Sequence, residues 1–302
     1  QNSSFESVIS IKAETHNFPT TVEPFSGAAT GSGGEIRDRL AGGQGSIPLA
    51  GTAVYMTPYP RFENSKFGFH ERKWLYQKPI DILIKASNGA SDFGNKFGQP
   101  LISGSLLTFG HKEGNKLIGF DKVIMLAGGV GYGKLEHSKK KKIENGDLII
   151  VLGGDNYRIG MGGAAVSSTE TGKYSSGIEL NAVQRSNPEM QKRVANVIRS
   201  IVESENNFIK SIHDHGAGGH LNCISELVED VGGVLNIDDL PIGDKTLSSK
   251  EIIGNESQER MGLVISEKDF NKLKEICDRE RAPIYKVGKV IDNGRFLVRS
   301  NS

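Results

Sequence analysis

Several features are scarce in this sequence, and each scarcity excludes a class of protein. The 302 residues include only two cysteines, too few for a disulfide framework, so we expect a reducing compartment, the cytoplasm. No apolar run approaches the roughly 20 residues that a membrane-spanning helix needs. The formal net charge of +1 provides no field that would gather nucleic acid or an anionic membrane. We therefore predict neither a nucleic acid nor a membrane as partner.

A short basic block and the start of the chain are the next local features. Lys139–Lys142 is the one basic block, and so short a block is more typical of a solvated loop than of a binding patch. The chain begins with Gln1 instead of Met and has no signal-peptide or transit-peptide pattern. We expect this start to be a cut inside a longer polypeptide.

Glycine is the residue in excess, with 38 of 302 positions. This is about 13%, against a usual share of about 7%, and no collagen-like period accompanies it. Because glycine weakens helices and strands, we expect tight turns and close backbone approach where it clusters. The clusters are Gly27–Gly34, Gly42–Gly45, Gly128–Gly133, Gly153–Gly163 and Gly216–Gly219.

The length predicts two domains, at about 100–200 residues each. A glycine- and lysine-rich stretch over 128–147 predicts the boundary, with an N-terminal domain over 1–135, truncated at its start, and a C-terminal domain over 145–302. Strands interleaved with helices predict an α+β fold and not a doubly wound sheet. We expect strands at 7–13, 122–127, 147–152, 208–212, 261–265, 284–290 and 295–298, the last two as a hairpin, and helices at 79–85, from Asn187, 221–231 and 267–279.

Lys12, Glu14 and His16 alternate along the first predicted strand and therefore share one face, at intervals of about 6–7 Å. A cation, a carboxylate and an imidazole in a row are typical of a phosphate-and-metal site with a base. The alternative is a polar, solvated strand face. The intervening residues, which we expect to be buried, are Ile9, Ile11 and Ala13.

A glycine-rich segment, Gly27–Gly34, follows, and we predict a loop there. It matches neither a Walker A loop nor a Rossmann fingerprint. Its small residues would let backbone N–H groups converge on phosphate, and a helix beginning at Glu35 would add its dipole. Arg37 can clamp a second phosphate, and Asp38 can hold Mg²⁺ as a hard oxygen ligand.

The stretch His213–His220 repeats this pattern, since a strand end and an acid precede glycines that enter a helix. We predict Asp214 as a second Mg²⁺ ligand, with Gly216–Gly219 close to phosphate. A glycine-capped turn with surface histidines is the plainer alternative. A zinc site remains a minor alternative, because the spacing of its ligands matches no structural zinc signature; those ligands would be His213, His215, His220 and Cys223.

Two further stretches contain a glycine-rich and a polar pattern. Gly129–Gly133 is followed by a basic loop and no helix, so a dinucleotide site is rejected there. The polar run Asn255–Arg260 precedes an apolar strand and fits a solvated turn and a site loop equally well.

In this order, these residues resemble the phosphoribosylformylglycinamidine synthase family of purine biosynthesis, in its long single-chain form. The resemblance covers essentially the whole chain and implies the tandem two-domain fold of the aminoimidazole ribonucleotide synthetases, with an N-terminal mixed sheet with helices and a C-terminal α/β layer. The segments that carry it are 14–17, 27–38, 183–190, 213–219, 255–260 and 279–283.

The resemblance implies an ATP-dependent ligase with Mg²⁺ that acts on formylglycinamide ribonucleotide and glutamine-derived ammonia. By position, the family's ATP lysine matches Lys12, its proton acceptor matches His16, and its Mg²⁺ ligands match Glu14, Asp38 and Asp214. The implied nucleotide segment is Gly27, Ala28, Ala29, Thr30, Gly31, Ser32, Gly33, Gly34, Glu35, Ile36, Arg37 and Asp38. The implied substrate contacts are Thr15, Asn17, Phe18, Arg37, Gln184, Glu256, Ser257 and Gln258.

Some residues depart from the family pattern. Phe18 stands where a second histidine is common, and His215 and His220 stand where a hydrophobe and a leucine are usual; we interpret the two histidines as tolerated substitutions. An upstream catalytic histidine motif, a second synthetase half and a glutaminase domain are absent. Neither Cys223 nor Cys277 lies in a nucleophile-elbow context, so we expect no glutamine hydrolysis.

The expected partners are therefore those missing parts of the same polypeptide, and a homodimer through an exposed sheet face or edge. Two alternative functions stay open. One is a non-catalytic nucleotide-binding scaffold. The other is a different member of the superfamily, such as an aminoimidazole ribonucleotide or selenophosphate synthetase, against which 183–190 and 255–260 argue.

Overall fold

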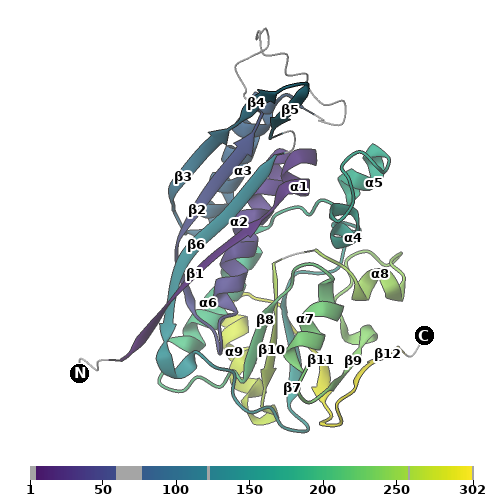
Figure 1. Ribbon diagram of the computed structural model, residues 1–302. Helices are drawn as coiled ribbons and strands as arrows, with labels where there is room; N and C mark the ends of the chain where they lie inside the picture. Colours follow the sequence, from purple (N-terminus) through teal and green to yellow (C-terminus); the bar gives the residue numbers. More distant parts are fainter. Residues whose placement is uncertain (1–4, 59–76, 121–122, 258, 301–302) are drawn as a thin grey trace.

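A four-stranded sheet and a six-stranded sheet, with helices between and around them, form the main body of the computed structural model (Figure 1). The structure describes residues 5–58, 77–120, 123–257 and 259–300. The first sheet is built from the N-terminal half of the chain and the second from the C-terminal half. This arrangement confirms the expected α+β class.

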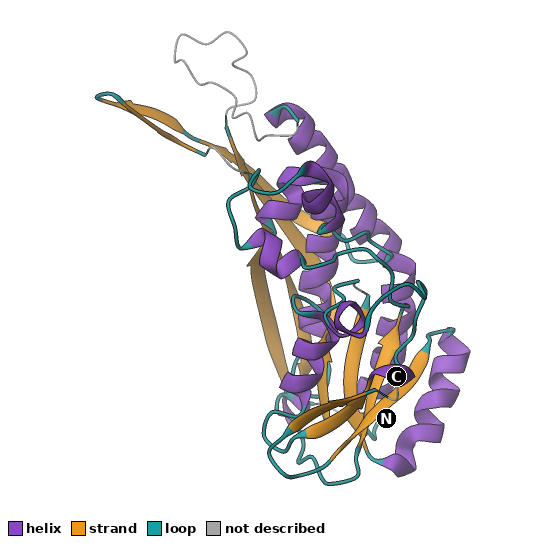
Figure 2. Ribbon diagram, turned by 90° about the vertical axis from the view of Figure 1, so that its right-hand side faces the viewer, coloured by secondary structure: helices purple, strands orange, loops and turns teal. Residues whose placement is uncertain are grey.

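The N-terminal sheet has the order β1 (Ser7–Thr15), β6 (Ile124–Lys134), β2 (Ile47–Thr57) and β3 (Leu101–Thr108). Only the β2–β3 pair is parallel. One face is covered by α1 (Asn17–Val22), α2 (Pro24–Leu40) and α3 (Pro79–Phe97). A two-stranded ribbon of β4 (Gly110–Glu113) and β5 (Lys116–Gly119) projects away from the body, at the upper left of Figure 2.

The other face of this sheet has no covering layer within the described residues. Ile9 is 69% exposed and Ile11 is 84% exposed, and Ala13 is exposed as well. The expectation that these three residues are buried is therefore wrong. Lys12, Glu14 and His16 take the covered face instead, because the small residues of α2 leave room for their polar side chains.

The C-terminal sheet has the order β12 (Phe296–Arg299), β9 (Gly233–Asn236), β11 (Ile284–Val290), β7 (Leu148–Gly153), β10 (Arg260–Ile265) and β8 (Ser211–Asp214). Helices α6 (Pro188–Val202) and α9 (Phe270–Glu280) pack on one face, and α7 (Gly219–Leu227) and α8 (Ser249–Ile253) on the other. The expected final hairpin is wrong, because β12 pairs in parallel with β9 and not with β11.

Short elements connect these layers. Helices α4 (Gly163–Ser167) and α5 (Ser176–Asn181) lie above the C-terminal sheet, near α1 (Figure 1). Single 3₁₀ turns occupy Leu135–His137, Ile237–Asp239 and Glu267–Asp269. No helix in the described ranges is long and apolar enough to cross a membrane.

Helix α2 joins the two halves. Its residues Ala29, Ile36 and Leu40 belong to one buried cluster with α3, with α6 and with the β7 and β10 strands of the C-terminal sheet. Ala28, on another side of α2, packs against the N-terminal sheet. The hydrophobic core is therefore continuous across the junction.

The expected loop at Gly27–Gly34 is wrong, because this segment is the middle of helix α2. A Cβ at Gly27 would lie 2.3 Å from the carbonyl carbon of Pro19, and one at Gly33 would lie 2.7 Å from the Phe93 ring. Glycine therefore permits close packing of α1 and α3 on α2, and this packing outweighs its low helix propensity. Consequently no helix begins at Glu35, and no helix N-terminus faces a phosphate there.

At the ends of the other elements, some expectations agree with the structure and others differ. Asn187 caps α6 as expected, since its side chain accepts a hydrogen bond from the Met190 N–H, and the strand at 284–290 is confirmed as β11. The stretch 128–134 lies in β6, so the glycine-rich boundary begins only after that strand. Strand β8 begins at Ser211 instead of 208, and α3 continues to Phe97 instead of 85.

Candidate active site

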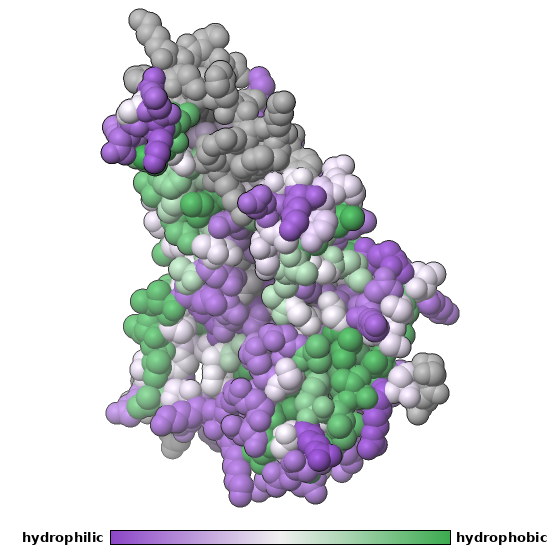
Figure 3. Space-filling view, turned by 45° about the vertical axis from the view of Figure 1, so that its right-hand side comes forward, coloured by the Kyte–Doolittle hydropathy of each residue, from purple (hydrophilic) through white to green (hydrophobic). Residues whose placement is uncertain are grey.

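A pocket of about 330 Å³ opens between the two halves of the chain, within the usual size range of small-molecule sites. In Figure 3, hydrophilic residues gather along the junction between the upper, N-terminal part and the lower, C-terminal part. The pocket is lined by Glu14, Thr15, His16, Asn17, Phe18 and Pro19, by Thr30, Gly34, Arg37 and Asp38 of α2, and by Gly163, Ala164, Ser167, Ala182, Gln184, Asp214, Gly216, Ala217 and Glu256.

Helix α2 contributes to the pocket through one face only. Thr30, Gly34, Arg37 and Asp38 follow helical spacing, so these four residues lie on the same side of the helix. The remaining residues of the expected nucleotide segment do not line the pocket: Gly27, Ala28, Ala29, Gly31, Ser32, Gly33, Glu35 and Ile36. Glu35, for example, pairs with Arg39 and accepts a hydrogen bond from Gln99 instead.

Three carboxylates, Glu14, Asp38 and Asp214, line the pocket, and Lys12, which is not among the lining residues, contacts two of them. Lys12 Nζ lies 2.7 Å from Asp38 Oδ2 and 3.8 Å from Glu14 Oε2. Burial, reinforced by the charge of Asp38, raises the pKa of Glu14 to about 7. The same two causes raise the pKa of Asp214 to about 6, and Asp214 also shares a hydrogen bond with Asp38. The wall therefore gathers more negative charge than its cations neutralise.

This donor set fits Mg²⁺ in its chemistry, since Glu14, Asp38 and Asp214 all offer hard carboxylate oxygens. Within the residues that the structure describes, however, no three His, Cys, Asp or Glu side chains are already arranged as a metal site. The expected zinc alternative is not supported either. His215 and His220 bond to each other through their ring nitrogens at 2.9 Å, and Cys223 lies against the His213 carbonyl.

His16 joins β1 to α1 and faces the pocket. Burial lowers the pKa of its imidazole to about 4, and the nearby Arg37 charge adds to this, while a hydrogen bond with the Gly27 backbone opposes it. The ring is therefore neutral near pH 7. Its Nδ1 has no hydrogen-bond partner among the described residues. Nδ1 is itself buried against Gly31 of α2, so it is the position of the neutral ring at the pocket wall, and not this nitrogen, that suits His16 to accept a proton from a ligand.

Arg37 is held from the C-terminal side. Its Nη1 donates to Gln191 Oε1 on α6 at 2.8 Å, and Gln191 Nε2 in turn donates to the Gly33 carbonyl at 3.0 Å. The guanidinium is 1% exposed. Arg37 therefore lines the pocket as a fixed group on a helix, whereas the sequence predicted a group that follows a loop.

Glu256 organises the opposite wall. One of its carboxylate oxygens accepts hydrogen bonds from the Ala164 N–H at 3.1 Å and the Gly218 N–H at 3.2 Å. The other accepts from Gln184 Nε2 at 3.4 Å. Burial raises the pKa of this carboxyl. Ser257 does not line the pocket and donates to the Ile159 carbonyl, while Gln258 lies outside the described residues.

Phe18 is placed at the edge of the pocket in an apolar setting. It belongs to a small buried cluster with Val22 of α1, Val166 of α4, and Ala182 and Val183. The ring therefore helps to hold the α4–α5 segment on α1. The sequence did not predict Gly163, Ala164, Ser167 or Ala182 as pocket residues, and the glycine cluster at 153–163 was the one available signal.

The fold and this pocket agree with a known family. The family described as "AIR synthase related protein, C-terminal domain" matches residues 144–300, just over half of the chain. The chain belongs to the AIR synthase related family.

One curated relative and two solved structures are similar to this chain over nearly its whole length. The chain is 41% identical over 298 residues to the phosphoribosylformylglycinamidine synthase of Dictyostelium discoideum, an alignment that covers 96% of this chain and 22% of that protein. Among solved structures, T. maritima PurL complexed with FGAR matches with a TM-score of 0.80 at 27% identity, over 99% of this chain and 44% of that one. T. maritima PurL complexed with ATP matches with a TM-score of 0.73 at 25% identity, over 99% and 43%. The chain thus spans about a fifth of the curated relative.

Proposed function

We propose that this chain is part of an ATP-dependent ligase of purine biosynthesis. In that reaction formylglycinamide ribonucleotide, ammonia from glutamine and ATP give formylglycinamidine ribonucleotide, ADP and phosphate. The observation that supports it most is one pocket that combines the charged wall of β1 and α2 with the Gln184–Glu256 wall. The similarity to proteins named for this activity, across nearly the whole chain, points the same way.

Each wall takes one role in this proposal. Lys12 and Arg37 bind phosphate oxygens of ATP, and Arg37 also helps Gln184 and Glu256 to orient the ribonucleotide, with Thr15 and Asn17. ATP phosphorylates the amide oxygen of the ribonucleotide. Ammonia then attacks the amide carbon and displaces phosphate, and His16 accepts the proton that is released there. Glu14, Asp38 and Asp214 would hold Mg²⁺, which when bound neutralises charge on the phosphates.

The uncovered face of the N-terminal sheet supports the partner that we propose for this chain. A face with Ile9 and Ile11 largely exposed is typical of a contact surface. We propose that a second synthetase half of the same polypeptide covers it, or a second copy of the chain when that half is missing. A glutaminase domain elsewhere in the polypeptide would supply the ammonia.

We also propose the finer assignments that the sequence predicted: an N-terminal domain over 1–135, a C-terminal domain over 145–302, and a cytoplasmic location. The family match at 144–300 supports the second boundary. Both cysteines are buried and unpaired, which supports a reducing compartment.

Calorimetry tests the binding part of the proposal. We expect the 302-residue chain to bind ATP–Mg²⁺ and formylglycinamide ribonucleotide in separate titrations, with Lys12→Met weakening ATP–Mg²⁺ alone. Binding of neither ligand would contradict the proposal. In the longer ligase, His16→Ala should abolish turnover while nucleotide binding survives; near-normal turnover would remove His16 from the mechanism.

A further inference from the structure

Arg260, the first residue of β10, is a fully buried cation that none of the proposed steps uses. Its guanidinium joins two loops behind the Glu256 wall. Nε donates to the Gly154 carbonyl at 2.8 Å, Nη2 to the Asp155 carbonyl at 3.0 Å, and Nη2 also to Asn255 Oδ1 at 3.1 Å. Nη1 lies 3.4 Å from the Asn255 carbonyl. One side chain thus donates hydrogen bonds to oxygen atoms from residues 154, 155 and 255, and it ties the partly buried carbonyls of Gly154 and Asp155 to the Asn255 loop.

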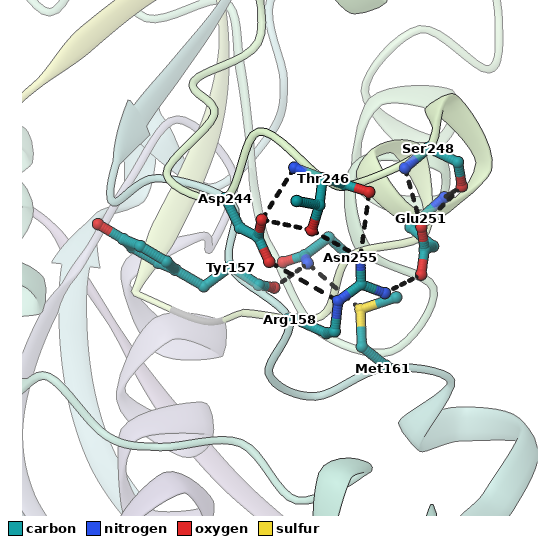
Figure 4. Close-up of polar contacts among 8 residues, drawn as sticks. All are labelled: Tyr157, Arg158, Met161, Asp244, Thr246, Ser248, Glu251 and Asn255. Carbon is teal, nitrogen blue, oxygen red and sulfur yellow. Dashed lines mark hydrogen bonds and ion pairs between the residues drawn. The ribbon is translucent and has the colours of Figure 1, made fainter.

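Asn255 continues this connection into the pocket wall. Its Oδ1 accepts from Arg260 and from the Ser257 N–H at 2.9 Å, while its Nδ2 donates to the Tyr157 carbonyl at 2.6 Å. Figure 4 shows the Asn255 side chain reaching the Tyr157 backbone and lying beside Met161. The orientation of the Asn255 amide is therefore set on both sides, and Glu256 is the next residue along the chain.

Glu256 passes the constraint on to the pocket. Because its carboxylate accepts the N–H groups of Ala164 and Gly218, any displacement of Glu256 moves two backbone amides of the wall. Arg260 therefore acts through Asn255 and Glu256 on the place where the segments of Ala164, Gly218 and Glu256 meet.

We propose that Arg260 is a positioning residue for the ribonucleotide wall, acting through Asn255 and Glu256 and leaving the ATP wall of β1 and α2 untouched. This inference rests on the proposed function, in which Gln184 and Glu256 orient the ribonucleotide. It assigns to Arg260 a selective effect on one of two ligands, which general loss of stability does not produce.

Arg158 provides a matched control on the same stretch of chain. Its guanidinium lies on the outer side of the 154–161 loop, half-exposed, where it pairs with Glu251 and Asp244 and donates to Thr246 (Figure 4). Among the described residues, its hydrogen bonds and ion pairs go to Asp244, Thr246 and Glu251, and none goes to Asn255 or Glu256. A change at Arg158 alters an arginine of this loop without touching the hydrogen bonds that hold Glu256.

The test is calorimetry of the 302-residue chain and its variants with formylglycinamide ribonucleotide and, separately, with ATP–Mg²⁺. A lysine at 260 keeps the charge but cannot span two loops. We expect Arg260→Lys to weaken ribonucleotide binding by up to about 100-fold and ATP–Mg²⁺ binding by much less, since only the Gly218 N–H links Glu256 to the predicted phosphate turn. Arg158→Lys should leave both affinities close to wild type. Unchanged ribonucleotide affinity in a folded Arg260→Lys protein, or equal loss of both ligands, would overturn the proposal.

A second variant and an NMR measurement test the same positioning role of Arg260. If Arg260→Lys does not fold, Asn255→Asp removes the donor to Tyr157 at constant size and should show the same selective loss. If the wild-type chain fails to bind the ribonucleotide, the proposed function is contradicted. Positioning is then judged by NMR alone: the Ala164 and Gly218 amide resonances should shift in Arg260→Lys or Asn255→Asp and stay in place in Arg158→Lys. Unshifted Ala164 and Gly218 amide resonances would contradict the positioning role of Arg260.

Discussion

Two glycine-rich segments border the same pocket, and glycine serves a different purpose in each. Within α2, the glycines of 27–34 have ordinary helical backbone angles, and neighbouring atoms occupy the space where a Cβ would project. In the 216–219 turn, Gly218 and Gly219 have φ angles of 79° and 61°, which side-chain-bearing residues rarely adopt. The first segment requires small volume, and the second requires backbone freedom. Alanine substitutions separate these two requirements.

The largest effect is expected for Gly219→Ala, because both requirements apply there. Its φ is 61°, and a Cβ would lie 2.4 Å from the Asn255 carbonyl oxygen. Backbone strain and overpacking together should lower the free energy of unfolding by roughly 4 kcal/mol, measured by urea denaturation. Gly146→Ala is the control, since its φ is 89° with nothing within 4 Å, and should cost about 1 kcal/mol. Equal losses at both positions would refute the role of the Asn255 contact.

Gly27→Ala should have the next largest effect, from volume alone. The added Cβ would meet the backbone of Pro19 and Thr20, at 2.3 and 2.4 Å, and two helices cannot yield as a flexible side chain does. We expect a loss of about 3 kcal/mol in the free energy of unfolding. Gly177→Ala in α5 meets nothing within 4 Å and should change stability by no more than about 0.5 kcal/mol. A Gly27→Ala protein as stable as the Gly177→Ala control would show that α1 and α2 separate readily.

Acid should have a third, smaller effect at the 216–219 turn. The turn leads into His220, whose pKa is lowered by burial and by the charges of Arg260 and His215. Below about pH 6.5 the unfolded chain gains a proton there that the folded chain does not, so stability falls as the pH falls.

Urea denaturation across this pH range checks the assignment. His220→Leu should reduce the pH dependence without removing it, because burial also lowers the pKa values of His16 and His215; the variant also loses the hydrogen bond to Asn156. His111→Asn, at an exposed histidine of β4, should retain the wild-type dependence. An unchanged slope in His220→Leu would mean that other groups cause the acid sensitivity.

The smallest change in stability is expected for Gly216→Ala. A Cβ there would make only an ordinary contact, 3.4 Å from Asp214 Oδ2, and no positive φ is required. The free energy of unfolding should change by less than about 0.5 kcal/mol. If phosphate approaches this backbone as the sequence predicts, calorimetry should nevertheless show weaker ATP–Mg²⁺ binding. Unaltered ATP–Mg²⁺ affinity would remove Gly216 from the phosphate site.

Short motifs allowed the sequence to predict much of the pocket. Glu14, His16 and Asp38 were assigned from strand alternation and carboxylate chemistry, and the structure places all three at one wall. Gln184 entered only through the family resemblance, and Glu256 was otherwise one residue of a polar run that fits a turn or a site loop equally well. An amide and an acid far apart in sequence carry no local sign of proximity.

The errors have one physical origin, which is long-range packing. Glycines at 27–34 signal a loop by propensity, and only the neighbouring Pro19 and Phe93 explain why a helix forms there. Ile9 and Ile11 signal a buried face, but no described element covers it. Likewise, the pairing of β12 with β9 follows from the sheet order and not from nearness along the chain.

The shared position of α2 has a consequence for how the chain behaves as a unit. Since the same helix fills part of the core beneath both sheets, cutting the polypeptide between 135 and 145 would not yield two independent parts. A C-terminal piece without α2 would expose the apolar surface that Ile36 and Leu40 now cover, and an N-terminal piece would expose the opposite side of that contact. The two halves are therefore expected to unfold in a single cooperative transition.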